Sequence, residues 1–156
     1  FIDVLEQILD DTGMEAACLK LELTESVVMA VGDACALLEK LRSLGISLAL
    51  DDFGTGYSSL SYLKMLPVQQ LKIDRSFIEG IGHNAGDEAI IRTIMELARS
   101  LDFEVVAEGV ETAETEAVLL EMGCNCAQGY HYAPAMSVDD FVMWWKTSGE
   151  GVAHSA

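Results

Sequence analysis

Short apolar runs alternate with longer amphipathic stretches five times along this chain, and this alternation constrains the fold more than any other feature. Each pair of stretches has the length of one strand followed by one helix. After an opening helix, the predicted strands are 17–23, 46–51, 69–73, 103–107 and 124–127, and the predicted helices are 33–44, 57–66, 87–100, 112–122 and 137–146. The pattern predicts an α/β fold with a parallel sheet, either a doubly wound sheet or a (β/α)8 barrel.

Polar residues stand where the predicted strands end. These strand-end residues are Glu22, Asp51 with Asp52, Lys72 with Asp74, Glu108 and Gln128. In a barrel the carboxyl ends of the strands meet at one mouth, whereas successive ends of an open sheet are spread along a line. The polar ends therefore favour a TIM-like barrel, here an incomplete one of about five β-α units.

The alternation of side chains along a strand predicts which strand-end residue points into the barrel. Asp51 shares a face with the small residues Ser47 and Ala49, so we expect its carboxylate to point inward. Asp52 then points elsewhere until the following loop turns it.

Several carboxylates in one mouth would repel each other unless cations lay among them. Oxygen ligands without a nearby cysteine or histidine set favour the hard ions Mg²⁺ or Mn²⁺ over zinc. Two such ions can clamp a phosphodiester and activate a water for in-line attack. The residues therefore favour hydrolysis of a phosphate ester.

The net charge of −17 rules out simple electrostatic capture of a nucleic acid polymer or an anionic membrane. The four cysteines have neither metal-ligand nor disulfide-scaffold spacing, which indicates reduced thiols. No apolar run has the length of a membrane span, and no signal-peptide pattern opens the chain. We expect a cytoplasmic segment without membrane contact, although the parent protein could be anchored elsewhere.

Five motifs in a fixed order resemble the EAL domain of bacterial cyclic di-GMP phosphodiesterases. They are ELTES at 22–26, DDFGTGYSSL at 51–60, KIDRSF at 72–77, AEGVET at 107–112 and QGY at 128–130. The ordered set is far more specific than any one of its members.

The resemblance implies a modified (β/α)8 barrel that opens one phosphodiester of cyclic di-GMP to give linear pGpG with two Mg²⁺ or Mn²⁺ ions. The residues that match its metal ligands are Glu22, Asp51, Asp52 and Glu108. Lys72 is similar to the lysine that holds the attacking water or a phosphate oxygen. Gln128 matches the glutamine near the catalytic centre, where Glu108 is also placed.

The resemblance also assigns supporting residues around the loop that follows Asp52. Glu25 is similar to the glutamate that anchors this loop, and Gly54 and Gly56 allow it unusual backbone angles and movement. In the family this loop couples metal binding to dimerisation, so we expect a homodimer through 52–59.

Other conspicuous residues have two interpretations. Glu111 resembles a supporting residue, yet Glu111 and Glu25 could also be ordinary first-turn helix acids. Asp74 could support the site or cap a turn. His131 could lie at the edge of the substrate, although packing explains it more simply.

The sequence departs from the family pattern in its first part. The glutamate-alanine-leucine triplet that names the family is absent from the strand ends. The similar Glu88-Ala89-Ile90 opens a helix instead of ending a strand. The family's substrate-binding arginine and asparagine metal ligand belong upstream of Phe1. We therefore expect the C-terminal part of an EAL domain at 1–147, a flexible tail at 148–156 and no activity in isolation. A sensory or GGDEF domain is expected upstream in the same polypeptide.

Two other functions compete with hydrolysis. An EAL-like receptor or protein-interaction module would have lost metal carboxylates, yet every ligand that this segment should supply is present. A dinucleotide-binding oxidoreductase is suggested by Gly54-Thr55-Gly56 after a strand. The third glycine of that fingerprint is absent, and two aspartates would repel a pyrophosphate there.

Overall fold

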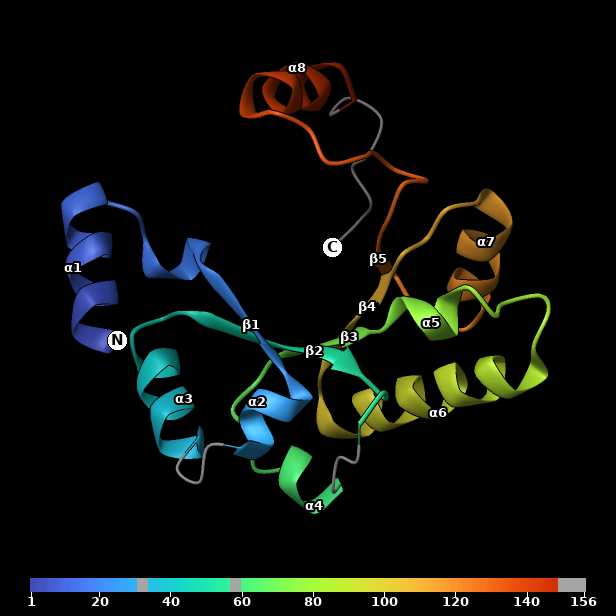
Figure 1. The fold of residues 1–156 in the computed structure, drawn as a ribbon, viewed down its shortest axis with the longest axis horizontal. Helices are drawn as coiled ribbons and strands as arrows, with labels where there is room; N and C mark the ends of the chain where they lie inside the picture. Colours follow the sequence, from blue (N-terminus) through green and yellow to red (C-terminus); the bar gives the residue numbers. More distant parts are fainter. Residues whose placement is uncertain (31–33, 57–59, 149–156) are drawn as a thin grey trace.

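The computed structural model describes residues 1–30, 34–56 and 60–148 (Figure 1). Its parallel strands form one sheet in which spatial order follows chain order. The strands are β1 (Lys20–Thr24), β2 (Ser47–Phe53), β3 (Gln70–Ile73), β4 (Glu104–Glu108) and β5 (Cys126–Gln128). A doubly wound sheet reverses its strand order at one point. Among the described strands the order never reverses, so the topology favours the barrel.

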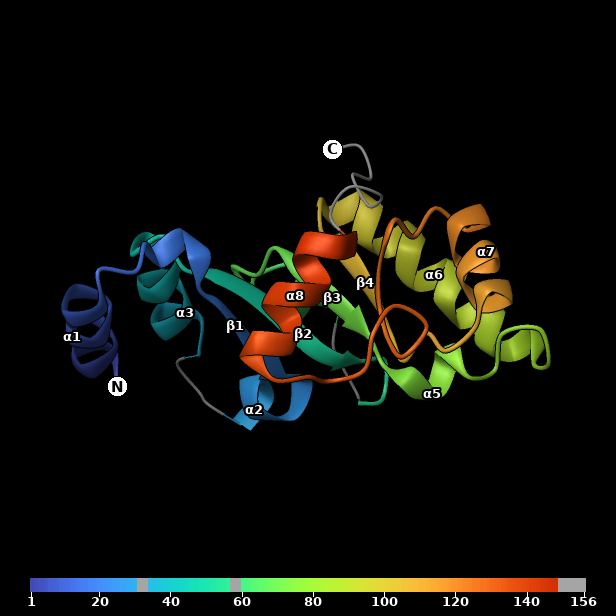
Figure 2. The same ribbon diagram turned by 90° about the horizontal axis from the view of Figure 1, so that it is seen from above.

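The helices lie mainly on one side of the sheet. They are α1 (Ile2–Thr12), α2 (Glu25–Ala30), α3 (Ala34–Ser43), α4 (Leu60–Leu63), α5 (Arg75–Ile78), α6 (Ala85–Leu101), α7 (Ala113–Glu121) and α8 (Val138–Ser148). In Figure 1, α2, α3, α4 and α6 lie on one side and α8 lies on the other. Figure 2 shows α8 crossing over the strands on that second side. Within the described part of the chain, no helix is both long enough and apolar enough to cross a membrane.

The two faces of the sheet differ because side chains alternate along each strand. One face carries aliphatic side chains that are almost fully buried with the helices: Leu48, Leu50, Leu71, Ile73 and Ala107. Burying a side chain such as Leu71 contributes about 2 kcal/mol to stability. The other face carries polar residues, and Gln70 and Lys72 are buried there. The same strands therefore build the core on one face and position polar groups on the other.

The first strand begins later than the sequence predicts. Residues Ala16–Cys18 form a short 3₁₀ helix, and β1 starts only at Lys20. The mostly apolar run at 17–23 predicts one strand, but a short apolar run does not distinguish a turn of helix from a strand.

Two short helices, α2 and α5, were not predicted. α2 follows β1 without a loop, and Val27 and Val28 in its sequence favour a strand when read locally. α5 is a single turn, too short to produce a helical period. Its signal is Asp74, whose Oδ1 accepts a hydrogen bond from Ser76 N at 3.0 Å. Both helices start directly after a strand end, so they lie next to the polar strand-end residues.

Some predicted elements extend beyond the described residues. The predicted helix at 33–44 appears as α3, and residue 33 lies outside the description. The predicted helix at 57–66 appears as the shorter α4, with residues 57–59 outside it. In the predicted tail at 148–156, Ser148 is the last residue of α8, and 149–156 lie outside the described residues, so the flexibility of the tail stays a prediction.

Candidate functional site

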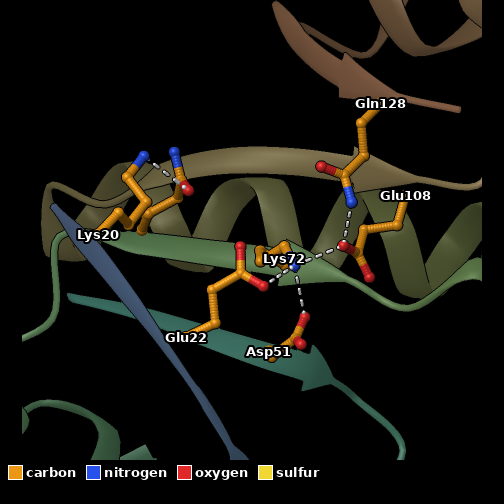
Figure 3. A network of polar contacts seen from close by, with 7 residues as sticks. Lys20, Glu22, Asp51, Lys72, Glu108 and Gln128 are labelled. Carbon is orange, nitrogen blue, oxygen red and sulfur yellow. Dashed lines mark hydrogen bonds and ion pairs between the residues drawn. The ribbon is translucent and has the colours of Figure 1, made fainter. Parts of the chain in front are cut away.

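Polar side chains from the five described strands converge at one end of the sheet (Figure 3). They form what we call the rim, which consists of Glu22, Asp51, Lys72, Glu108 and Gln128. Each comes from a different strand, and parallel strands bring their carboxyl ends to the same edge. The predicted meeting of these residues is confirmed by their contacts.

Lys72 is the centre of this cluster. Its Nζ lies 2.6 Å from Glu22 Oε2, 2.7 Å from Glu108 Oε1 and 2.9 Å from Asp51 Oδ1. Only 5% of the lysine side chain is exposed. Burial disfavours the charged ammonium, but the contacts with Glu108, Glu22 and Asp51 outweigh it and raise the pKa of Lys72 above its usual value. The lysine is therefore a fixed positive charge among three acids.

Asp51, Asp52 and Glu108 form a second cluster beside the ammonium. One carboxylate oxygen from each lies within 4.8 Å of the others. Burial, and then the charges of Asp51 and Asp74, raise the pKa of Asp52. Burial also raises the pKa of Glu108, against the opposing effect of Lys72. Negative charge is therefore concentrated here beyond what one lysine neutralises.

A β-bulge brings Asp52 into this cluster. The pairing of β2 with β3 shifts register between Leu50 and Phe53, and Asp52 has the left-handed φ of 54°. Strict alternation would direct neighbouring aspartates to opposite faces. The bulge turns the second one toward the first, as bulges near sites commonly do. The predicted turning of Asp52 thus occurs within the strand, before the loop begins.

The donor atoms fit a hard divalent cation. Asp51 Oδ1 is buried and, among the described residues, has no well-directed hydrogen bond, since its 2.9 Å contact with Lys72 is an ion pair off the hydrogen-bond direction. The cluster of Asp51, Asp52 and Glu108 offers only carboxylate oxygens. Such a set suits Mg²⁺ or Mn²⁺ better than zinc.

Gln128 completes the rim from β5. Its Nε2 donates a hydrogen bond to Glu108 Oε1 at 2.5 Å (Figure 3). The residues are paired directly in the register of β4 and β5. Glu108 is therefore held from both sides, by Lys72 and by Gln128.

Glu25 lies beneath the loop that follows β2. It is 6% exposed, and within the described residues its Oε1 has no hydrogen-bond partner. A Cβ at Gly56 would lie 2.6 Å from that same Oε1. Gly54 has a φ of 101°, and a Cβ there would be 3.0 Å from Phe77. The loop thus packs closely on Glu25, while residues 57–59 of the proposed dimer contact lie outside the description.

Asp74 and Glu111 support the elements around the rim. Asp74 caps α5 and also accepts from Ser76 Oγ at 2.5 Å. Glu111 accepts from Arg75 Nη2 at 2.7 Å, which ties the segment after β4 to α5. Sequence reasoning missed Arg75, although its place inside the KIDRSF motif was a signal.

A lower polar layer was also missed. Lys20 Nζ donates to Gln70 Oε1 at 3.1 Å, and Gln70 Nε2 donates to Glu104 Oε2 at 3.2 Å. Figure 3 shows Lys20 in this layer, on the same face as the rim. Counting back two positions from Glu22 and Lys72, and four from Glu108, would have found all three, because side chains recur on a face every second residue.

Comparison with known proteins identifies the family. The sequence model of the EAL domain matches residues 1–135. MucR of Pseudomonas aeruginosa, a bifunctional diguanylate cyclase/cyclic di-GMP phosphodiesterase, is 45% identical over 130 residues, or 83% of this chain and 19% of MucR. The cyclic di-GMP phosphodiesterase NbdA of the same organism is 43% identical over 145 residues, or 90% of this chain and 18% of NbdA. The chain thus spans about a fifth of the length of these relatives.

Solved structures agree with the sequence comparison. The MucR phosphodiesterase in complex with c-di-GMP superposes with a TM-score of 0.86 at 42% identity, covering 90% of this chain and 57% of that one. The EAL domain of Mycobacterium smegmatis DcpA gives a TM-score of 0.86 at 40% identity, covering 94% of this chain and 66% of that one. The predicted incomplete barrel of about five β-α units is confirmed by these matches. This chain belongs to the EAL domain family.

Proposed function

We propose that this chain carries the main part of a metal-dependent site that hydrolyses cyclic di-GMP to linear pGpG. The observation that carries the proposal is the buried Lys72 ammonium, held by acids from three different strand ends beside a carboxylate cluster. The activities of MucR and NbdA support the choice of substrate.

The residues proposed to hold the metal ions are Glu22, Asp51, Asp52 and Glu108. Their oxygen atoms suit two Mg²⁺ or Mn²⁺ ions. When bound, the ions would clamp the phosphodiester and make a water more acidic. Asp51, whose buried oxygen lacks a directed donor among the described residues, would offer that oxygen to a metal ion.

The chain's own residues supply the remaining chemistry. Lys72 donates to a phosphoryl oxygen or holds the attacking water, where a fixed positive charge stabilises the negative charge of the transition state. Glu108, whose Oε1 accepts a hydrogen bond from Gln128 Nε2, would accept the proton of that water. The water oxygen bonds to phosphorus, the bond to the ribose 3′ oxygen breaks, and that oxygen takes up a proton. The product is linear pGpG.

The proposal includes the setting of the domain. It treats 1–147 as part of an EAL barrel and 148–156 as a tail, in a cytoplasmic, homodimeric protein that pairs through 52–59. A GGDEF or sensory domain in the same polypeptide is proposed by analogy with MucR, which is also a diguanylate cyclase. The isolated chain is expected to be inactive, because the five strands of its described residues do not close a barrel of eight.

The test measures release of pGpG from cyclic di-GMP with Mg²⁺ or Mn²⁺. It compares this chain alone with the same chain joined behind the N-terminal part of the MucR phosphodiesterase domain, which supplies the strands that MucR has in addition. The control is Asp51→Asn in the joined protein. Circular dichroism establishes that each protein is folded.

Activity of the joined protein that Asp51→Asn abolishes supports the proposal. A folded joined protein that binds cyclic di-GMP tightly yet releases no pGpG contradicts it and leaves a receptor function. Activity that survives Asp51→Asn also contradicts it, because the carboxylate cluster would then be dispensable.

A further inference from the structure

Another polar cluster, formed by Glu116, His131 and Tyr132, lies beside the rim, where the turn after β5 meets α7. Glu116 of α7 uses both of its carboxylate oxygens, and the two partners are neighbours in the sequence. Oε2 lies 3.1 Å from His131 Nε2, and Oε1 accepts from Tyr132 Oη at 3.0 Å. The two rings meet edge to face at 5.1 Å. One side chain on a helix therefore holds two consecutive residues of the turn.

This cluster is more sheltered than an ordinary surface ion pair. The side chains of His131 and Glu116 are 27% and 31% exposed. Burial, and then the hydrogen bond to Glu116, raise the pKa of Tyr132 to about 12. Exposed ion pairs contribute little because water competes for both partners. Here partial burial and two partners for one carboxylate reduce that competition.

The turn held by Glu116 starts directly at Gln128. Val110 N donates to Gln128 O at 3.1 Å, and His131 N donates to Val110 O at 3.0 Å. Between them, a Cβ at Gly129 would lie 2.1 Å from Val110 O, so the two backbones are in close contact. His131 is thus fixed at its backbone by Val110 and at its ring by Glu116. His131, which Glu116 contacts, is only three positions after Gln128 in the chain.

We propose that Glu116 is a positioning residue that holds the turn after β5 and thereby directs the Gln128 side chain toward Glu108. Glu116 acts through His131 and Tyr132, while Gln128 makes the contact with Glu108 that Figure 3 shows. The consequence for catalysis rests on the proposed function, but the positioning itself is a property of the chain without metal or substrate.

The test observes Gln128 directly by nuclear magnetic resonance in the metal-free chain. The side-chain amide signals of Gln128 are assigned by their loss in Gln128→Ala. Glu116→Ala should shift these signals and increase hydrogen exchange at the His131 amide about tenfold, the size expected for losing hydrogen bonds to a charged group. Glu116→Gln, which keeps an accepting oxygen, should shift the Gln128 signals and speed exchange at His131 less than Glu116→Ala does. The matched control is Glu121→Ala, an exposed acid of the same helix, which should change neither signal.

Unchanged Gln128 amide signals in a folded Glu116→Ala protein would overturn the proposal. If Glu116→Ala does not fold, Tyr132→Phe and His131→Leu decide, because each removes one of the two contacts. Smaller shifts of the Gln128 signals in both variants support the proposal, and none in either overturns it.

A kinetic measurement separates this proposal from the proposed function. In the joined protein with MucR strands, Glu116→Ala should lower kcat about tenfold with little change in KM, since an oriented group acts mainly in the transition state. Absence of any turnover in the joined protein contradicts the proposed function alone, because the resonance experiment still decides the positioning of Gln128.

Discussion

Lys72 Nζ and Glu108 Oε1 lie 2.7 Å apart at the ends of the paired strands β3 and β4. The same ammonium also contacts Glu22 and Asp51. A buried charge of this kind is tolerated because its opposite charges surround it. Lys72 therefore has two roles in our account, as the internal counterion of the rim and as a group that faces the substrate.

Replacing Lys72 tests the counterion role. Lys72→Met should destabilise the metal-free chain by about 2 to 4 kcal/mol, because three acids lose their shared cation. The loss is smaller than for a fully buried pair, since 46% of the Glu22 side chain is exposed. Added Mn²⁺ should restore more stability in the variant than in the parent chain. Urea unfolding with and without Mn²⁺ measures both effects.

Lys20→Met is the matched control for Lys72→Met. Lys20 lies on the same face, is exposed and makes its hydrogen bond to Gln70. Its loss should cost less than about 1 kcal/mol. Equal destabilisation by the two substitutions, or an equal response to Mn²⁺, would contradict the counterion role.

Asp52 provides a test of the metal site that spares the backbone. Asn tolerates the left-handed conformation that Asp52 adopts, so Asp52→Asn should fold normally. Losing one carboxylate should weaken Mn²⁺ binding by about tenfold, because affinity follows the number of charged ligands. Electron paramagnetic resonance of free Mn²⁺ measures the affinity. Asp102→Asn is the control, since Asp102 also has a positive φ but ends α6 before β4 begins, whereas Glu108 is the last residue of that strand. A Mn²⁺ affinity unchanged by Asp52→Asn would remove Asp52 from the site.

Gly129→Ala should be strongly destabilising. Its Cβ would meet the Val110 carbonyl oxygen at 2.1 Å, and backbone cannot move aside as a flexible side chain can. We expect a loss of about 3 kcal/mol or more in the free energy of unfolding. Gly82→Ala is the comparison, because Gly82 has a φ of 81° but open space around it. That change should cost only about 1 kcal/mol, the cost of the left-handed conformation. Similar losses for both glycines in urea unfolding would contradict the close approach.

Tyr132 predicts a change of stability at alkaline pH. Burial, and then Glu116, raise the pKa of this phenol to about 12, so the folded chain favours its protonated form. That contribution is fully present below the ordinary pKa of about 10 and is lost as the pH rises toward 12. Tyr132 is 39% exposed, so screening limits the contribution to about 1 kcal/mol. In a pH titration followed by phenolate absorbance, Tyr132→Phe should lack the step that occurs at the highest pH. Loss of a step near pH 10 instead would show that Glu116 does not hold the phenol.

Much of this protein is determined by its sequence alone. The alternation of apolar runs and amphipathic stretches predicts a parallel sheet, because buried parallel strands are apolar along their whole length. The order of Glu22, Asp51, Lys72, Glu108 and Gln128 predicts one polar rim, since parallel strands end at the same edge. Period-two alternation is a local property of the backbone, so the inward direction of Asp51 could also be inferred.

Only the tertiary structure decided the rest, because it depends on residues far apart in the chain. The bulge that turns Asp52 exists only through the pairing of β2 with β3. Lys72 becomes the centre of three acids only when three strands are placed side by side. Glu116 and His131 are 15 positions apart and meet because α7 packs against the turn after β5. Local patterns specify faces and ends of elements, whereas distances across elements arise only from packing.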